Sequence, residues 1–489
     1  MPTREPCPLF INGEWITSTQ TETEPVYNPS EGVRISATPM CGAGEVDRAV
    51  KAASAAFPAW AETPALERAR LMFRFKELLE KHYEELSQIV TREHGKTLDE
   101  SRGSVRRGIE VVEFACGAPS LLMGEALENI ARDIDCDTIR QPLGVSVAIT
   151  PFNFPVMVPL WTLPIALVCG NTFVLKPSEK VPLSAIRMVQ LLSEAGLPPG
   201  VVNLVHGGRE AVDTLLSHPD VRTVSFVGST PVAKYIYETA TRNGKRVQSA
   251  GGAKNYMVVL PDAEPDATVD AVMGSAYGCA GERCMAGSVL VCTHDAAERF
   301  LPLLSNAARG LRVGPTDRDA NAQMGPLVTP QHLEKVRASI HTGLSEGANL
   351  IVDGREVVVH TCPNGFYLGP TIFDHVQPHM QIAREEIFGP VLSVMRADNL
   401  DAAIQNCNNS GYGNAAVLFT ESGGAARKFR HSINAGMVGI NTGVPAPMAF
   451  FPFSGWNNSF FGDLHVQGHE GISFFTRQKV TITRWTRSA

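Results

Sequence analysis

The sequence predicts an α/β protein whose first domain is a doubly wound, mainly parallel β-sheet. Four short hydrophobic runs rich in β-branched residues recur between turn signals, at 145–150, 172–176, 201–205 and 223–227. The segment 184–196 between two of these runs has helical spacing and ends at a glycine followed by Leu-Pro-Pro-Gly, which is a helix stop. Buried strands that alternate with helices are typical of a parallel sheet with helices on both faces.

A second α/β pattern runs from about residue 256 to residue 441, with strands predicted at 257–260, 288–292 and 391–395. We therefore expect a second domain. The tail, 473–485, alternates polar and apolar residues like a strand that leaves its own core. Such a strand can pair with a neighbouring subunit.

The composition limits the class of protein. The chain has 489 residues, of which 44% are hydrophobic and 19% charged, so it is long enough for two or three compact domains. Its net charge of −7 comes without any block of Lys and Arg, which argues against a nucleic-acid partner. Ten cysteines without a CxxC pair predict no disulfide framework and no metal site. Together with an N-terminus unlike a secretory signal, they favour a cytoplasmic location.

One stretch argues for a membrane at first sight. Residues 141–175 contain no Asp, Glu, Lys or Arg, and this length would cross a bilayer. Five prolines and two asparagines interrupt the stretch, however. A continuous helix exposed to lipid does not tolerate this punctuation, so we expect buried elements of a globular core and no membrane partner.

Two local motifs suit chemistry. The fingerprint GxGxxG is missing, but FVGST (226–230) places Ser229 and free backbone N–H groups at a predicted helix start, where an anion is favoured. An ordinary helix N-cap fits the same residues. Cys284 lies in the small-residue stretch 278–288, and the adjacent Arg283 is expected to lower the pKa of its thiol. The other nine cysteines, Cys279 included, are expected to be inert core residues.

Six segments occur in the order in which aldehyde dehydrogenases carry similar motifs. They are PFNFP (151–155), NTFVLKPSE (171–179), FVGST (226–230), GERCMA (281–286), EEIFGPV (385–391) and FFTRQKV (474–480). Within that superfamily, GERCMA, RRGIEVVEFA (106–115), GAKN (252–255) and the segment 446–465 resemble the methylmalonate-semialdehyde dehydrogenase family, including its bacterial malonate-semialdehyde enzymes. The resemblance runs nearly from end to end of the chain.

The resemblance implies an aldehyde dehydrogenase-like fold of three parts. The NAD-binding domain would comprise 1–122 and 143–255, the catalytic domain 256–445, and a β-strand oligomerisation arm 123–142 and 446–489. Family members with this layout are homotetramers built as dimers of dimers, and by analogy we expect the same assembly here.

The resemblance also implies a covalent mechanism. Cys284 matches the nucleophile that adds to the aldehyde, and Asn153 matches the amide that forms an oxyanion hole with the backbone N–H of Cys284. Collapse of the alkoxide would transfer hydride to the nicotinamide and leave an acyl thioester. Taken without the resemblance, Asn153 would be a loop cap.

NAD is the implied cofactor. Lys176 and Glu179 match residues that hold the adenosine ribose, and Ser229 matches the pyrophosphate contact. A carboxylate at position 179 would repel a 2′-phosphate, which favours NAD over NADP. The other implied contacts are Glu386 and Phe388 at the nicotinamide ribose and ring, with Thr150, Phe152, Lys180 and Gly251 lining the same cleft. Taken singly, the charged residues at 176, 179 and 180 would also fit a solvated cluster.

Two positions depart from the hydrolytic aldehyde dehydrogenases. Ala250 stands where those enzymes have a general-base glutamate, and Arg477 stands where they have a second glutamate. Without a carboxylate there to activate water, the acyl-enzyme should resist hydrolysis and react with coenzyme A, whose thiol ionises more readily than water. No separate CoA motif is present, and some relatives have Asn at the position of Ala250.

Arg107 and Arg283 match the family's arginines for the substrate carboxylate, and paired guanidinium donors suit a small acidic aldehyde. Arg102 and Arg106 compete with Arg107 for this role, and a surface or interdomain salt bridge is the alternative for Arg107 and Arg283. The implied substrates are malonate and methylmalonate semialdehyde, which differ by one methyl group. After oxidation the carboxylate lies β to the thioester carbonyl. Loss of CO2 and transfer to CoA would then give acetyl-CoA or propionyl-CoA.

Two other functions stay open at this point. One is a CoA-independent dehydrogenase that releases the free acid of an acidic semialdehyde. The other is a non-catalytic relative that keeps the fold as a binding protein, and the presence of both Cys284 and Asn153 argues against it.

Overall fold

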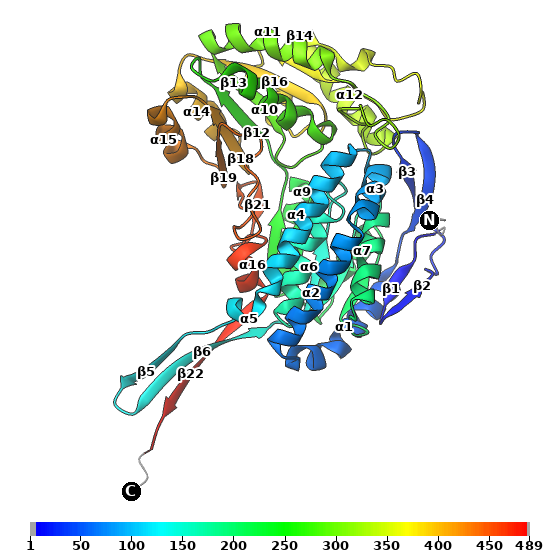
Figure 1. The fold of residues 1–489 in the computed structure, drawn as a ribbon, viewed down its shortest axis with the longest axis vertical. Coiled ribbons are helices and arrows are strands. Elements are labelled where there is room, and N and C mark those ends of the chain that lie inside the picture. Colours follow the sequence, from blue (N-terminus) through cyan, green and yellow to red (C-terminus); the bar gives the residue numbers. More distant parts are fainter. Residues whose placement is uncertain (1–5, 487–489) are drawn as a thin grey trace.

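The computed structural model describes residues 6–486, which form two α/β units and a narrow three-stranded sheet that extends away from them (Figure 1). In Figure 1 one unit lies above the other, and the narrow sheet projects from the lower unit. The prediction of an α/β protein is confirmed.

The sheet of the lower unit has eight strands in the order β2-β1-β9-β8-β7-β10-β11-β21. Its five central strands run parallel, and β1, β2 and β21 join the two edges antiparallel. The strands are β1 (Leu9–Ile11), β2 (Glu14–Ile16), β7 (Val145–Ile149), β8 (Thr172–Lys176), β9 (Val202–Leu204), β10 (Val221–Val227), β11 (Arg246–Ala250) and β21 (Phe460–Phe461). All four strands predicted for this sheet are present, so its mainly parallel character is confirmed.

Helices cover both faces of this sheet, as a doubly wound fold requires. Successive residues of β8 point to opposite faces, because Phe173 and Leu175 belong to one buried hydrophobic cluster and Val174 to another. The first cluster includes side chains of α2 (Ala65–Lys81), α3 (Tyr83–His94), α4 (Leu98–Cys116), α6 (Met157–Val168) and α7 (Leu183–Glu194). The second includes side chains of α1 (Ala43–Glu62), α8 (Arg209–Ser217) and α9 (Thr230–Arg242).

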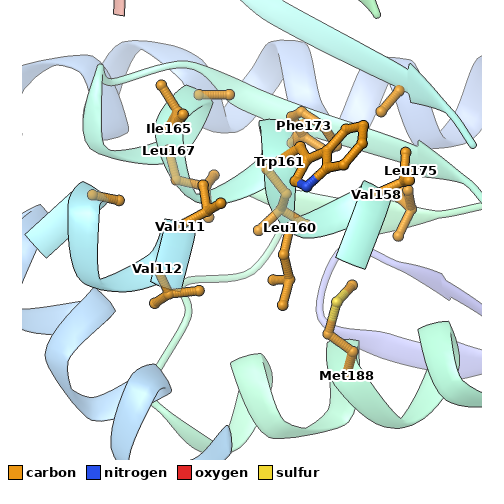
Figure 2. Packing of buried hydrophobic residues seen from close by; sticks show 14 of the residues in the cluster. Val111, Val112, Val158, Leu160, Trp161, Ile165, Leu167, Phe173, Leu175 and Met188 are labelled. Atoms are coloured by element: carbon orange, nitrogen blue, oxygen red, sulfur yellow. The ribbon is translucent and has the colours of Figure 1, made fainter. Parts of the chain in front are cut away.

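The charge-free stretch 141–175 supplies the centre of this unit. It forms β7, α6 and most of β8, and every residue from Val158 to Val168 is buried. Figure 2 shows Leu160 and Trp161 of α6 packed in the same cluster as Val112 of α4. The absence of charge is therefore a consequence of burial on all sides. Among residues 6–486, no helix combines the length and the apolar character that crossing a bilayer requires.

The upper unit contains a seven-stranded sheet in the order β14-β15-β16-β13-β12-β18-β19, in which only the β14–β15 pair is antiparallel. Its strands are β12 (Asn255–Val259), β13 (Gly287–Thr293), β14 (Asn349–Val352), β15 (Thr371–Asp374), β16 (Val391–Ala397), β18 (Ala415–Phe419) and β19 (Met437–Ile440). Its helices are α10 (Pro265–Tyr277), α11 (His294–Gly310), α12 (Pro330–Ser345), α13 (Gln381–Arg384), α14 (Leu400–Asn408) and α15 (Gly423–Ser432), with short 3₁₀ turns η1 (Gly278–Gly281) and η2 (Gly354–Glu356). The three strands predicted here are all present.

The projecting sheet consists of β5 (Ala126–Ala131), β6 (Ile134–Pro142) and β22 (Thr476–Arg484). β22 pairs antiparallel with β6 along its whole length, so the predicted tail strand does leave its own core. Of the described part of 446–489, only β22 lies in this sheet, because β21 pairs with β11 and α16 (Gly468–Phe474) packs against α6. The remaining elements are β3 (Thr23–Asn28), β4 (Val33–Pro39), β17 (Tyr412–Gly413), β20 (Trp456–Asn457) and α5 (Ala118–Leu121).

Candidate active site

Cys284 lies where two cavities meet. A large cavity of about 1080 Å³ and a small cavity of about 270 Å³ both include this residue in their walls. Among the described residues, Cys284 is the only one that lines both. A ligand in either cavity can therefore contact this residue.

The large cavity brings together every residue that the sequence assigned to the nucleophile, the oxyanion hole and the cofactor. Besides Cys284, its wall includes Thr150, Phe152, Asn153, Lys176, Glu179, Lys180, Ser229, Gly251, Glu386 and Phe388. These residues are separated by up to 238 positions in the chain (150 to 388) and come from both α/β units. Their meeting is what an extended ligand that spans the two units requires.

The loop before Cys284 has an unusual backbone. Cys279 and Ala280 both have φ of 51°, and Gly281 has φ of 75°, so three successive residues adopt the left-handed region. Non-glycine residues enter this region only where surrounding contacts compensate the strain. The side-chain amide of Asn255 holds the other end of the loop by donating to the carbonyl oxygens of Cys284 at 2.8 Å and Ala286 at 3.1 Å. The nucleophile loop is therefore fixed on both sides of the sulfur.

The thiol of Cys284 is not ionised by its surroundings. Burial and, to a smaller extent, the nearby carboxylate of Glu386 raise its pKa to about 12. Arg283 does lower the pKa, as expected, but by less than burial raises it. The direction expected for Arg283 is therefore confirmed, but desolvation outweighs it, so the thiol stays largely protonated in the protein without ligands.

Asn153 is buried and connects the loop that follows β7 to the nucleophile loop. Its side-chain nitrogen donates to the carbonyl oxygen of Glu282 at 2.9 Å, and its backbone carbonyl oxygen accepts from Nζ of Lys96. The contact with Glu282 uses only one of the two hydrogens of the side-chain nitrogen. Asn153 can therefore hold the loop and still donate to a ligand.

Glu386 and Phe388 both line the large cavity, and the carboxylate of Glu386 is close enough to the thiol to raise its pKa. Oε1 of Glu386 accepts from the backbone N–H of Ala253 at 3.0 Å, and burial raises the pKa of its carboxyl to about 7. A Cβ at Gly252 would lie 2.3 Å from Oε2 of Glu386, so a side chain there would displace this carboxylate. Phe388 has a left-handed φ of 58° and packs edge-on against Phe152, with ring centroids 5.6 Å apart.

His332 is a cavity residue that the sequence did not indicate. It lies near the start of α12, its Nε2 is 2.7 Å from the carbonyl oxygen of Phe388, and its ring contacts that of Phe152 with centroids 6.0 Å apart. The only local feature in the sequence is Thr329 before Pro330, which is typical of a helix N-cap and does not indicate a site residue. Gln331 and Lys335 of the same helix also line the large cavity.

The far end of the large cavity has the features of a nucleotide site. Lys176 donates to the carbonyl oxygen of Gly207 at 2.8 Å and lies 3.5 Å from Oε2 of Glu179. Burial raises the pKa of Glu179, but Lys176 and Lys180 outweigh this effect and its net pKa is lowered, so the carboxylate is ionised. A negative charge at this position suits ribose hydroxyls rather than a phosphate.

The phosphate-binding prediction rests on the start of α9. Ser229 is the N-cap residue of this helix, yet its side chain makes no cap hydrogen bond. Its hydroxyl and the first N–H groups of α9 therefore remain available to an anion. Thr150 adds a second open polar group, because its buried Oγ1 has no hydrogen-bond partner in the described part of the chain.

The small cavity contains Arg107 and Arg283. Arg107 pairs with Glu110 at 3.2 Å, and Arg283 pairs with Glu100 at 2.9 Å. The alternative arginines, Arg102 and Arg106, form ion pairs elsewhere and do not line the small cavity. Arg102 pairs with Glu84 and Asp99, and Arg106 pairs with Glu80. Among the four arginines considered from the sequence, the structure thus places only 107 and 283 at this site.

The two departures from the hydrolytic pattern lie in different places. Ala250 is the last residue of β11 and is buried beside the large cavity's Gly251, whereas Arg477 lies on exposed β22 opposite Gln141. Neither position supplies a carboxylate. In the described ranges, no cluster of three or more His, Cys, Asp or Glu side chains is arranged to hold a metal ion.

Comparison with known protein families gives a match over most of the chain. A model described as the aldehyde dehydrogenase family matches residues 15–481. The chain is 50% identical over 476 residues to a malonate-semialdehyde dehydrogenase of Halalkalibacterium halodurans, covering 97% of this chain and 98% of the relative. It is 51% identical to malonate-semialdehyde dehydrogenase 1 of Geobacillus kaustophilus, covering 97% of each.

Solved structures agree with these relatives. The crystal structure of methylmalonate-semialdehyde dehydrogenase from Oceanimonas doudoroffii superposes with a TM-score of 0.97 at 48% identity, over 99% of each chain. A structure from Sinorhizobium meliloti 1021, assigned to the same activity and complexed with NAD, gives a TM-score of 0.97 at 44% identity over 99% of this chain and 98% of its own. The resemblance and the fold class predicted from the sequence are both confirmed.

Proposed function

This chain belongs to the aldehyde dehydrogenase family, and on that premise we propose that it oxidises malonate or methylmalonate semialdehyde with NAD and transfers the decarboxylated acyl group to coenzyme A. The products are acetyl-CoA or propionyl-CoA, formed through a thioester on Cys284. The observation that carries the proposal is the position of this sulfur at the junction of a nucleotide-sized cavity and a small cavity with two arginines.

The residues of the large cavity fit NAD. Support comes from the open N-terminus of α9 at Ser229, the unpartnered hydroxyl of Thr150 and the ionised carboxylate of Glu179. Glu386, whose carboxylate lies against Gly252, lines the same cavity as Phe388. NAD supplies the hydride acceptor when it is bound. The relative from S. meliloti that matches this chain was crystallised with NAD, which supports the same choice here.

The chain's own residues perform the acyl transfer. The thiol of Cys284 loses its proton to solvent as its sulfur adds to the aldehyde carbon, and the carbonyl oxygen becomes an oxyanion that the amide of Asn153 stabilises together with the Cys284 N–H. Departure of the aldehyde hydrogen as hydride regenerates the carbonyl as a thioester. Arg107 and Arg283 hold the acid end of the substrate in the small cavity.

Decarboxylation follows from the chemistry of the acyl group. The carbon–carbon bond to the carboxylate breaks and CO2 leaves. The electron pair of that bond moves to the oxygen of the thioester and forms an enolate, which the same oxyanion donors stabilise. A proton from solvent then restores the carbonyl. The arginines bind the carboxylate before this step and release CO2 after it.

Coenzyme A is the proposed acceptor because the two usual water-activating glutamates are replaced by Ala250 and Arg477. The decisive experiment is a steady-state NADH assay with and without CoA, combined with mass spectrometry of the products. We expect turnover to stop after one stoichiometric burst when CoA is omitted. Undiminished turnover with release of a free acid would instead support the CoA-independent alternative, and no burst at all would support a non-catalytic protein.

We also propose the three-part organisation with an oligomerisation arm, and a homotetrameric assembly in the cytoplasm. The projecting sheet supports an assembly role because it carries apolar side chains that its own subunit leaves exposed, namely Leu127, Ile139, Val480 and Ile482, and exposed Trp485 follows directly after β22. Exposed apolar patches of this kind mark subunit contacts. Within residues 6–486 the structure shows no disulfide bond, which fits a reducing compartment.

A further inference from the structure

Glu100 lies in the wall of the small cavity and connects three parts of the site. It is the third residue of α4, and Oε2 accepts from the backbone N–H of Thr97 at 3.0 Å in the capping box of that helix. Oε1 accepts from the backbone N–H of Cys279 at 2.6 Å and from Nη2 of Arg283 at 2.9 Å. One carboxylate therefore joins a helix start, the left-handed turn before the nucleophile and a cavity arginine.

These contacts determine where the guanidinium of Arg283 points. Its Nε donates to Sγ of Cys279 at 3.2 Å, Nη1 to the carbonyl oxygen of Gly274 at 3.1 Å, and Nη2 to Glu100. The group lies over Gly278, where an added Cβ would be 2.4 Å away. A guanidinium has five N–H donors, so these three contacts leave two for a ligand.

The charges of the small cavity show why orientation matters. The charged residues in its wall are Arg107, Arg283, Glu100 and Glu110, paired two by two. Two positive and two negative groups give no net positive charge to attract an anion. Preference for a carboxylate must therefore come from N–H donors held at the right angle rather than from the field of the cavity.

We propose that Glu100 is a specificity-determining positioning residue, which aims Arg283 at the carboxylate of the substrate and so selects acidic over neutral aldehydes. The inference rests on the proposed function, because it concerns the same small cavity. Glu100 acts through Arg283 and need not touch the substrate.

The test compares kcat/KM for malonate semialdehyde and for propanal, which lacks the acid group. In Glu100→Ala we expect the ratio of the two to fall about tenfold or more, the effect of one lost charge-assisted hydrogen bond, mainly through KM for the acid. Glu100→Gln should keep most of the ratio, since its amide oxygen can still accept from Arg283 and Cys279. Should the alanine variant fail to fold, Glu100→Ser can still serve the helix start and should show the same fall.

Thr97→Ala is the matched control, because it removes the other half of the capping box and leaves the contacts of Glu100 with Arg283 in place. Its substrate ratio should equal that of the wild type. In the double variant with Arg283→Ala, the change at Glu100 should have no further effect on the ratio.

Two results overturn the inference in distinguishable ways. If Arg283→Ala loses the preference for the acidic aldehyde and Glu100→Ala keeps it, Glu100 does not position Arg283, and the proposed function stands. If the wild-type enzyme itself does not prefer malonate semialdehyde to propanal, the proposed function fails and the inference fails with it.

Discussion

Asn153 donates a hydrogen bond from its side-chain nitrogen to the carbonyl oxygen of Glu282, at 2.9 Å and two residues before Cys284. The same nitrogen carries the second hydrogen that the proposed oxyanion hole needs. One amide thus holds the nucleophile loop and is also the proposed donor to the oxyanion. Removing it should affect the position of the loop and the rate of acylation.

Asn153→Ala should lower kcat about 10²–10³-fold, the usual cost of one oxyanion donor. Steady-state NADH formation measures the loss, and the size of the pre-steady-state burst separates acylation from later steps. Asn243→Ala, which removes an exposed amide at the C-cap of α9, should leave kcat unchanged. A loss of less than tenfold would contradict the role of Asn153.

Alkylation of Cys284 by iodoacetamide should be slow at pH 7 and should accelerate about tenfold per pH unit up to pH 10, since only the thiolate reacts. The physical reason is that burial holds the pKa of the thiol at about 12 in the protein without ligands. Intact-protein mass spectrometry gives the rate, with Cys284→Ser as the background. A rate that levels off below pH 9 would show that the thiol is already ionised.

Glu386→Gln should speed this alkylation at a fixed pH. The carboxylate of Glu386 raises the pKa of Cys284, so replacing it with a neutral amide lowers that pKa and increases the thiolate fraction. The same mass measurement at pH 8 tests the sign. A slower reaction would mean that Glu386 accepts the thiol proton instead of opposing its loss.

Arg283→Ala and Arg107→Ala should each raise KM for malonate semialdehyde about tenfold or more and change KM for propanal much less, because only the first substrate has a carboxylate to bind. Arg106→Ala is the matched control, since that side chain pairs with Glu80 outside the cavity. Equal changes in KM for the two substrates would contradict the proposal that the arginines bind the substrate carboxylate.

Glu179→Ala should lower the preference for NAD over NADP on the order of tenfold, because it removes a negative charge that repels a 2′-phosphate. The ratio of kcat/KM for the two cofactors measures this. The neighbouring change Ser178→Ala keeps the carboxylate and should keep the ratio. An unchanged ratio in Glu179→Ala would place the specificity elsewhere in the cavity.

The sequence predicted four strands of the first sheet and three of the second, because each is a local run of β-forming residues, as β8 at Thr172–Lys176 shows. It did not predict that β21 joins the first sheet, since a strand of two residues has no period to detect. His332 escaped notice for a related reason: its meeting with Phe388 depends on the tertiary packing of α12, which no local pattern records. The choice among Arg102, Arg106 and Arg107 likewise needed the partners of each guanidinium, which lie on other turns and helices.

The sharing of Cys284 by two chambers has a consequence for inhibitor design. A small electrophile bound to Cys284 would adjoin both cavities. Substituents could then be extended in two directions from one covalent anchor. An anionic arm would meet the guanidinium groups on one side, and an aromatic arm would meet the rings of Phe152 and Phe388 on the other.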